Sequence, residues 1–551
     1  MNWKRALFVF HRWAGIVLCL MFALWFVSGI FMMYVEFPQL LPAEKRAGVE
    51  SLDFSTARLT PGEAAARLTP LDFSTASNAA ENFPSSVAKD APLKFTEIRL
   101  GMLLGRPVYY IRVKGNARTR TVFADTGTVL PPLDAQTARR VAQDFAMRAR
   151  WISDPSKVTY SDLLQTDQWA VSSALNPHRP LFLFALNDPA GTDVYVSSTT
   201  AEVVRDTRRW ERVGNYFAAV THWIYPTFLR RHVDAWDWVI YIVSGAGTLL
   251  AISGLWIGVL RWRWRRPPGK SAIPYRGVMR WHYISGAVFG LLSLTWVFSG
   301  LLSMNPGGIN SPRSPTTANS LVFSGKELTP TDFAIPAMTA ADQVVDAHLL
   351  HYDGQPFFRI TRRNGSSELA SAVSTAGQRT AYRPDTRALL QRAPMLMPGT
   401  AVANVHLLED YDSYYYARYP ERSDKSLPVI RIQFADPDRT WFYIDPATGQ
   451  VLERSTHFNR VYRWLYNGLH SWDIPWLWAR RPLWDVVVVI SSLGGVGLSV
   501  LGIVVGIRRL RFDLSGHRHR NRDRLPQPFN GQLSGSSGLE GAGRSPPTRS
   551  R

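Results

Sequence analysis

Four long apolar segments constrain this chain more than any other feature of its sequence. They cover residues 8–34, 236–260, 278–304 and 484–507. A helix of about 20 apolar residues crosses the ~30 Å hydrocarbon core of a bilayer, and each segment is long enough to do so. No small-residue cleavage site follows the first segment, so we interpret it as a permanent anchor and not as a signal peptide. The sequence therefore predicts an α-helical membrane protein with four transmembrane helices.

Basic residues adjoin these segments on one side of the predicted membrane. They precede the first segment, fill the link at 261–277 without one acidic residue, and follow the fourth segment. The positive-inside rule places these regions, and with them both termini, in the cytoplasm. Because this distribution accounts for most of the formal net charge of +20, we expect membrane lipid and not nucleic acid as the partner of the basic residues. We predict a multi-pass membrane protein with both termini in the cytoplasm.

This topology fixes the predicted order of regions along the chain. They are transmembrane helix 1 at 8–34, an extracytoplasmic domain at 35–235, transmembrane helix 2 at 236–260, a cytoplasmic basic link at 261–277, transmembrane helix 3 at 278–304, a second extracytoplasmic domain at 305–483, transmembrane helix 4 at 484–507 and a cytoplasmic tail at 508–551. From about residue 515 the tail is rich in Arg, Gly, Ser and Pro, a composition typical of disorder.

Each extracytoplasmic domain contains two stretches in which apolar and polar residues alternate and then meet a turn. This pattern predicts half-buried β-hairpins. Helix-like segments lie between them, at 134–150 and 340–350. We therefore expect two related α+β domains. The predicted hairpins begin at Gly105, Thr192, Gly354 and Trp441.

Two blocks of the sequence recur, and each recurrence keeps a histidine. The segment His11-Arg-Trp-Ala-Gly15 returns as His282-Tyr-Ile-Ser-Gly286, 271 positions later. His222 returns as His470, 248 positions later, within the matching blocks 195–237 and 443–485. A single histidine at a membrane interface is ordinarily an amphipathic anchor, and common descent alone can retain a structural residue. Retention of both pairs in a diverged background favours a chemical function. The sequence thus predicts an internal two-fold duplication.

Several of these motifs resemble those of the PepSY-associated transmembrane (PepSY-TM) family. They are paired spans with a histidine where the chain enters the membrane, an exported hairpin domain with Gly105-Arg-Pro107 and Asp125-Thr-Gly127, and a histidine shortly before the membrane. The resemblance extends from Met1 to about Phe512. It implies two PepSY-like domains and an inner-membrane protein linked to iron uptake. Some members are di-haem ferric-siderophore reductases, whereas other PepSY proteins are sensory or regulate peptidases.

The positions of the histidines suit haem ligation. Both halves insert with the same orientation, so His11 and His282 lie at the same cytoplasmic depth and face one axis. Two imidazoles on opposite sides of an axis suit a six-coordinate haem iron. By the same symmetry the second pair forms an outer site. We therefore predict about two b haems, with the cofactor-binding axial iron ligands His11, His282, His222 and His470.

The sequence contains no binding motif for other common redox cofactors. The single cysteine, Cys19, excludes disulfides, Cys-based iron–sulfur clusters and covalent c-type haem. No Gly-x-Gly-x-x-Gly fingerprint occurs, so the electron donor must be another protein, a quinone or a diffusible reductant. The pair His348 and His351 has the i, i+3 spacing of a weak metal motif. His232 and His457 break the duplication and are expected at the surface, with His232 as the alternative outer ligand.

The sequence as a whole predicts a haem-b electron conduit. By resemblance, the electron acceptor is a ferric siderophore or another extracytoplasmic ferric complex. The alternative is a non-enzymatic PepSY protein that senses, regulates or assists metal uptake. A carrier function has less support, because the carboxylates of the four spans, Asp237 and Asp485, lie at the outer ends of their spans and none lies deeper in the membrane.

Overall fold

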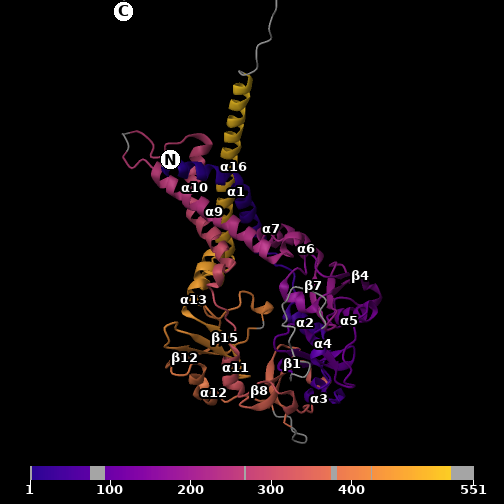
Figure 1. The fold of residues 1–551 in the computed structure, drawn as a ribbon. Helices are drawn as coiled ribbons and strands as arrows, with labels where there is room; N and C mark the ends of the chain where they lie inside the picture. Colours follow the sequence, from indigo (N-terminus) through magenta and orange to yellow (C-terminus); the bar gives the residue numbers. More distant parts are fainter. Residues whose placement is uncertain (1–2, 75–92, 266–268, 374–380, 424, 523–551) are drawn as a thin grey trace, which may run out of the picture.

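The protein consists of a helical bundle joined at one end to a region of β-sheets (Figure 1). The computed structural model describes the chain apart from residues 1–2, 75–92, 266–268, 374–380, 424 and 523–551. The bundle contains α1 (Trp3–Met32), α9 (Val233–Arg261), α10 (Gly277–Ser303) and α16 (Leu483–Arg522). These are the four predicted membrane helices, and each is long and apolar enough to cross a bilayer.

Each bundle helix packs against two others. Helix α1 contacts α9 and α16, and α10 likewise contacts α9 and α16, so α1 and α10 occupy opposite positions in the bundle. Large apolar side chains point outward from every helix. Val17, Ile242, Val288 and Ile490 are each at least 60% exposed, as expected of side chains that contact lipid.

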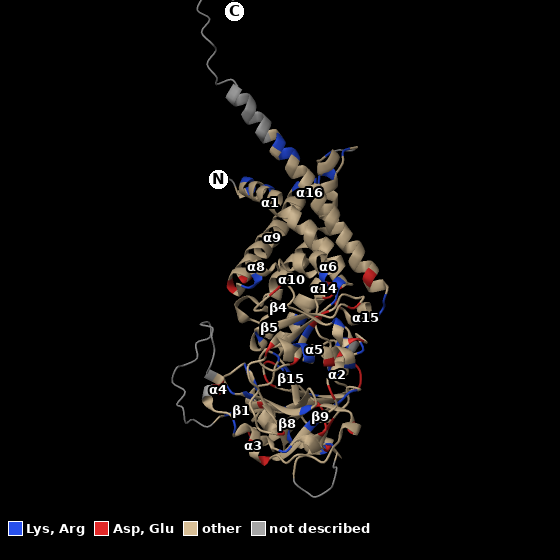
Figure 2. Ribbon diagram, turned by 90° about the vertical axis from the view of Figure 1, so that its right-hand side faces the viewer, with Lys and Arg blue, Asp and Glu red and all other residues tan. Residues whose placement is uncertain are grey.

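The last bundle helix is longer than the sequence analysis predicts. Helix α16 continues beyond residue 507 to Arg522, so the backbone at 515–522 is helical where the composition indicates disorder. The remainder of the predicted tail, 523–551, lies outside the described residues. In Figure 2, Lys and Arg mark the end of the bundle where α1 begins and α16 leaves.

The two loops between the helices share one antiparallel sheet. Its strand order is β11-β10-β9-β8-β1-β2-β3, and β1 pairs with β8 through Arg99 opposite His348 and Leu100 opposite Ala347. The alternating patterns predict the hairpins within each loop but give no sign of this pairing between loops. The strands are β1 (Phe95–Leu103), β2 (Arg106–Val113), β3 (Thr119–Phe123), β8 (Val344–Tyr352), β9 (Gln355–Arg362), β10 (Ser367–Ser371) and β11 (Ala381–Tyr382).

Each loop also forms a four-stranded antiparallel sheet of its own. The first contains β4 (Thr159–Leu164), β5 (Leu181–Ala185), β6 (Asp193–Ser197) and β7 (Val203–Thr207). The second contains β12 (Val402–Leu408), β13 (Val429–Phe434), β14 (Trp441–Ile444) and β15 (Val451–Ser455). All four predicted hairpins are present, as β2–β3, β6–β7, β9–β10 and β14–β15.

One of the two predicted loop helices is correct. The segment 134–150 forms α5 (Ala135–Arg148), which begins where the Asp134 carboxylate accepts a hydrogen bond from the Thr137 amide. The segment 340–350 is not a helix but mostly strand β8, whose buried and less buried residues largely alternate. The other loop helices are α2 (Pro42–Gly48), α3 (Pro61–Ala65), α4 (Pro70–Ser74), α11 (Thr317–Ser324) and α12 (Thr386–Arg392).

Short helices connect the four-stranded sheets to the bundle. After β7 come α6 (Arg209–Phe217), α7 (Ala219–His222) and α8 (Thr227–Arg230), which lead into α9. After β15 come α13 (His457–Arg463), a π-helical turn at Trp464–Gly468, α14 (Leu469–Ser471) and α15 (Pro475–Trp478), which lead into α16. Figure 1 shows α6, α7 and α13 between the bundle and the sheets. These connections carry the two histidines predicted at the outer face.

Candidate functional site: two pairs of histidines

The structure brings the two outer histidines together. His222 ends α7 and His470 lies in α14, yet their ring centroids are only 6.0 Å apart, with an angle of 72° between the ring planes. These residues occupy corresponding positions in the repeated blocks of the sequence. The predicted outer pair is therefore a real contact between the two halves of the chain.

Residues of α1 hold the His222 ring. Its Nδ1 lies 3.0 Å from the Ser28 hydroxyl and 3.2 Å from the Trp25 carbonyl oxygen. The Trp25 indole N–H in turn donates a hydrogen bond of 2.9 Å to the His222 carbonyl oxygen. An Nδ1–H that donates to a carbonyl leaves the Nε2 lone pair free, which is the form of histidine that binds a metal.

Residues of α10 hold His470 in the same way. Its Nδ1 lies 3.1 Å from the Ser299 hydroxyl and 3.2 Å from the Trp296 carbonyl oxygen. Ser299 and Trp296 correspond in sequence to the two α1 residues that hold the other ring. Both outer imidazoles thus have their Nδ1 atoms occupied by the protein and their Nε2 atoms available.

Electrostatics keep the outer pair neutral. Burial and, to a lesser extent, the nearby imidazole of His470 lower the pKa of His222 to about 3, against an opposing contribution from the Trp25 carbonyl. Burial likewise lowers the pKa of His470. Neutral imidazole is the species that ligates metal, so both rings are in the required protonation state near neutral pH.

The spacing of the outer rings fits two axial ligands of one metal. A metal–imidazole bond is about 2 Å long, and the nitrogen lies about 1 Å from the ring centre, so two opposed ligands place their centroids about 6 Å apart. The observed separation is 6.0 Å. The separation of the outer ring centroids is thus the size expected for two histidines that bind one metal ion from opposite sides.

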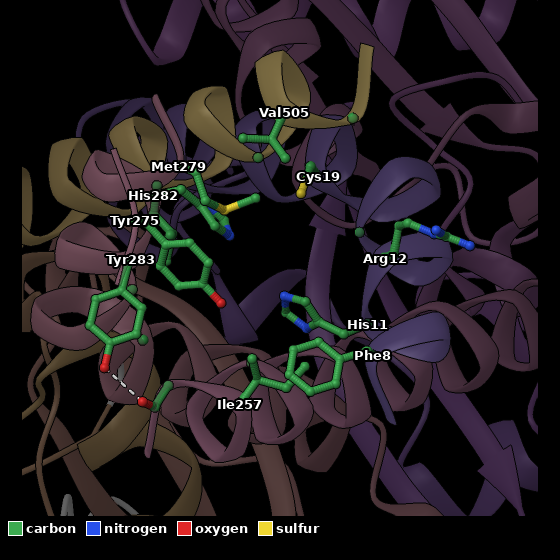
Figure 3. A pocket seen from close by; sticks show the side chains of 18 of the residues that line it. Phe8, His11, Arg12, Cys19, Ile257, Tyr275, Met279, His282, Tyr283 and Val505 are labelled. Atoms are coloured by element: carbon green, nitrogen blue, oxygen red, sulfur yellow. Dashed lines mark hydrogen bonds between the residues drawn. The ribbon is translucent and has the colours of Figure 1, made fainter. Parts of the chain in front are cut away.

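The two inner histidines face one large cavity. His11 on α1 and His282 on α10 both line a cavity of about 1500 Å³ inside the bundle. Figure 3 shows both imidazoles directed toward the space between them. Pockets for small molecules and cofactors have volumes of roughly 300–1,000 Å³, so this cavity is large enough for a tetrapyrrole.

The two inner rings are supported differently. The Nδ1 of His11 lies 3.1 Å from the Ser253 hydroxyl and 3.3 Å from the Leu250 carbonyl oxygen, both on α9. The Nδ1 of His282 is buried and has no hydrogen-bond partner among the described residues, although the Leu498 backbone of α16 lies near this ring. Each inner ring is therefore next to a helix of its own half, but a hydrogen bond orients His11 alone.

Glycines give the inner histidines their space. A Cβ atom at Gly254 would lie 2.7 Å from Cε1 of His11, which is closer than such atoms approach. A Cβ at Gly502 would lie 2.6 Å from the sulfur of Cys19 and 3.7 Å from Cε1 of His282. Gly254 and Gly502 each begin a Gly-x3-Gly motif, Gly254–Gly258 on α9 and Gly502–Gly506 on α16. Such motifs ordinarily serve close helix packing, and here Gly254 also leaves room for the His11 ring, while Gly502 leaves room for Cys19 next to His282.

The walls of the inner cavity match the chemistry of a haem. The lining is mostly apolar and includes no Asp or Glu among the described residues, whereas arginines lie along it. An arginine suits the carboxylates of haem propionates because its guanidinium forms paired hydrogen bonds with a carboxylate. Arg12 points away from the space between the histidines (Figure 3). The remaining lining arginines are Arg5, Arg276, Arg508 and Arg509.

The other histidines whose side chains the structure describes do not gather into a metal-binding cluster. His348 and His351 lie on β8 and not on a helix, so their side chains point to opposite faces of the sheet. His348 contacts Asp346, while the buried His351 contacts Asp332. No group of three His, Cys, Asp or Glu side chains in the described part of the chain could hold a metal ion. His232 and His457 are exposed, as expected.

The residues that support the outer rings are not evident from the sequence alone. The segment Trp25-Phe-Val-Ser28-Gly29 recurs as Trp296-Val-Phe-Ser299-Gly300. A tryptophan and a serine in a membrane helix, however, more often serve helix packing than a binding site. The structure shows that the serine hydroxyl and the tryptophan carbonyl contact the His222 ring. The signal that identifies such residues is their recurrence next to a recurring histidine.

Comparison with known proteins identifies the family of the chain. No curated protein matches it significantly. The model of the PepSY-associated transmembrane region matches residues 8–359, which include the first three bundle helices and three of the four site histidines. The protein belongs to the PepSY-associated transmembrane family.

Proposed function

We propose that this protein is a haem-b electron conduit of the bacterial inner membrane that delivers electrons to an extracytoplasmic ferric complex. The observation that carries the proposal is the outer pair, in which His222 and His470 lie 6.0 Å apart with equivalent hydrogen bonds at both Nδ1 atoms. Neutral histidines that merely anchor a helix need no such opposed arrangement. The same logic assigns His11 and His282 as ligands of a second haem.

Two redox centres at different depths suit transfer across a membrane. When bound, haem supplies one-electron chemistry by alternating between ferric and ferrous iron. The chain supplies the axial nitrogens, the hydrogen bonds that orient them, and an apolar surrounding that sets the redox potential. The inner pair opens toward the basic end of the bundle and the outer pair lies next to the sheets. Electrons would enter at the former and leave at the latter.

The topology and the duplication complete the proposal. The basic end of the bundle and both termini would face the cytoplasm, and both sheet-bearing loops the extracytoplasmic side. The corresponding contacts of α1 with His222 and α10 with His470 support an origin by internal duplication. A ferric siderophore is the proposed acceptor, because family resemblance links such proteins to iron uptake. The donor would be a protein, a quinone or a diffusible reductant.

An absorption spectrum of the purified full-length protein tests haem binding. We expect the spectrum of low-spin, six-coordinate b haem, with about two haems per chain. Replacing His222 or His470 by Ala should remove one haem, and replacing His11 or His282 the other. A colourless protein from haem-replete cells would refute the proposal and leave the alternative, a PepSY protein that senses or regulates without redox chemistry.

Proteoliposomes test the direction of transfer. With reductant sealed inside, an external ferric siderophore should be reduced by the wild-type protein. The His222→Ala variant should fail to reduce it while its inner haem still becomes reduced. If fully loaded wild-type protein reduces no external ferric complex, the haems have a sensory and not a conducting function.

A further inference from the structure

Helices α6 and α13 bury polar side chains and expose apolar ones. In α6, Asn215 is fully buried, whereas Trp210, Val213 and Phe217 are each more than half exposed. Helix α5 in the same loop has the ordinary arrangement, in which an apolar stripe is buried against the sheets. The outward face of α6 is therefore apolar where a helix in water would be polar, and leaving such a face in water is costly.

The second half of the chain repeats this apolar face. Phe458 and Val461 on α13, and Leu465 in the π-helical turn that follows, are each at least 37% exposed. Both faces have the spacing i, i+3, i+7 of one side of a helix. The corresponding residues of the two halves are Trp210 and Phe458, Val213 and Val461, and Phe217 and Leu465, each pair 248 positions apart. An exposed apolar face that is present in both copies indicates a surface contact common to both.

An arginine on the inner side of each helix fixes its rotation. Arg212 on α6 donates hydrogen bonds of 3.0 and 2.9 Å to two backbone carbonyl oxygens of its own sheet region. The corresponding Arg460 on α13 donates bonds of 2.9 and 2.7 Å to the two corresponding carbonyl oxygens. Because a helix held in this way cannot turn about its axis, the apolar face stays outward. The acceptors are Thr207 and Gly191 in the first half and Ser455 and Arg439 in the second.

The apolar face of α6 continues the outward surface of the membrane helices. The ring of Phe217 lies 5.8 Å, centroid to centroid, from that of Phe31 in the last turn of α1, and Phe31 is itself 42% exposed. On the other side, the hydroxyl of Tyr462 on α13 donates a hydrogen bond to the Leu302 carbonyl oxygen near the end of α10. Both helices thus adjoin the ends of membrane helices, at the junction of the bundle and the sheets (Figure 1).

We propose that the outward faces of α6 and α13 lie in the lipid leaflet at the sheet end of the bundle, in contact with acyl chains. An interfacial helix places its apolar face about 5–10 Å into the boundary between headgroups and acyl chains. The exposed rings of Trp210 and Tyr216 suit this depth, because Trp and Tyr concentrate at membrane interfaces. Helix α6 leads to His222 and α13 to His470, so lipid contact holds both outer histidines at the membrane edge. Such contact requires no haem.

Spin labels on the full-length protein test the lipid contact. In a Cys19→Ala background, which removes the native cysteine, Val213→Cys or Val461→Cys is labelled with a nitroxide and reconstituted into vesicles of phosphatidylethanolamine and phosphatidylglycerol. The ratio of collisions with oxygen, which enters lipid, to collisions with a water-soluble nickel chelate should be high at both positions. Ile242→Cys on the lipid-facing side of α9 gives the reference for lipid. Met147→Cys gives the reference for water, because Met147 is a 38% exposed apolar residue on α5, farther from the bundle than α6 (Figure 2).

The two collision rates separate lipid from the other possible occupants. Labels at Trp210 and Phe458, one turn earlier on the same faces, should give the same high ratio. A ratio equal to that at Met147 would show that the faces meet water, and the assignment would be wrong. Few collisions with either reagent would show that protein covers the faces, and magnetic broadening between labels on neighbouring copies would identify a second copy of the chain; this result also overturns the assignment. Absence of haem from the wild-type protein would refute the proposed function but would leave these ratios unchanged.

Discussion

Single residues next to the histidines decide whether the rings can reach their positions. Gly254 is the clearest example, because any side chain there would meet the His11 ring on the facing helix. A Cβ atom at the nearby Gly258 would have no other atom within 4 Å. Of these two glycines, Gly254 alone is required for close contact with the histidine ring. Protein interiors are so densely packed that even one added methyl group at Gly254 would collide with the His11 ring.

Gly254→Ala should displace His11 and remove the inner haem. The added Cβ would lie 2.7 Å from the ring, and overpacking of this kind costs about 1–3 kcal/mol. The measurement is haem per chain from the absorption spectrum, which should fall from about two to about one. Gly245→Ala on the same helix is the control and should keep both haems, since its added methyl group meets no atom within 4 Å, lies away from the cavity lining, and favours the helix by about 1 kcal/mol.

Ser28→Ala should weaken haem binding at the outer site without unfolding the protein. The change removes the hydroxyl 3.0 Å from His222 Nδ1 but leaves the Trp25 carbonyl in place. Loss of a group that orients a metal-binding histidine lowers affinity by roughly tenfold to a hundredfold. Haem titration of the apoprotein measures this effect. Ser244→Ala is the control, because this buried serine bonds only within its own helix; equal losses in both variants would contradict the role of Ser28.

Among the secondary-structure elements, one ion-pair network joins the two loops. Arg99 on β1 contacts Glu202, in the turn before β7, at 2.5 Å and Asp346 on β8 at 3.4 Å. Its guanidinium also lies 3.8 Å from the ring centroid of Tyr110. Burial raises the pKa of Glu202, but the attraction of Arg99 outweighs it and lowers that pKa to about 2. The network therefore stabilises the shared sheet wherever Glu202 is ionised.

Arg99→Gln should destabilise the sheet region by about 3 kcal/mol, the low end for a broken buried ion pair. The change removes the cation that Glu202 and Asp346 share, but Lys45 remains 3.6 Å from Glu202 and His348 remains 2.6 Å from Asp346. Arg112→Gln is the control; its pair with Glu97 is partly exposed to solvent and should contribute at most about 1 kcal/mol. Thermal unfolding at pH 7 measures both.

The stability lost in the Arg99→Gln variant should depend on pH, and the direction follows from the pKa of Glu202. The folded pKa of Glu202 is depressed, so its stabilisation is present above its unfolded pKa of about 4.5 and is lost as the pH falls toward 2. The difference between wild type and Arg99→Gln should shrink over that range. A difference that is constant from pH 7 to pH 3 would show that the ion pair is not its source.

Across the whole molecule, four histidines from both halves lie at two levels of one bundle. Helices α1 and α10 carry the inner pair and also hold the outer pair, through Ser28 and Ser299. The two levels are therefore linked by two rigid helices. Such a link fixes the relative position of two redox centres better than flexible loops would.

Topology reporters should place the two levels on opposite sides of the membrane. Alkaline phosphatase fused after Gly115 or after Gly399, both in exposed turns, should be active if the proposed topology, in which both loops are exported, is correct. Fusion after Gly269, in the basic link, should be inactive. Activity at Gly269, or inactivity at either loop position, would reverse the assignment of inner and outer histidines.

Features that depend on local composition and spacing could be predicted from the amino-acid sequence. The apolar segments specify four bundle helices, since length and hydrophobicity suffice for a bilayer. Alternation specifies the hairpins, and recurrence singles out His11, His282, His222 and His470. The failure at 340–350 is also local, because a short apolar run fits a helix or a strand until its partner strand is known.

Contacts between residues that lie far apart in the chain are evident only from the tertiary structure. The pairing of β1 with β8 and the hydrogen bonds of Ser28 and Ser299 join segments with no sequence signal for each other. The 6.0 Å separation of the outer rings belongs to the same class. Local patterns determine which face an element buries, but contacts between elements follow from how those faces pack together.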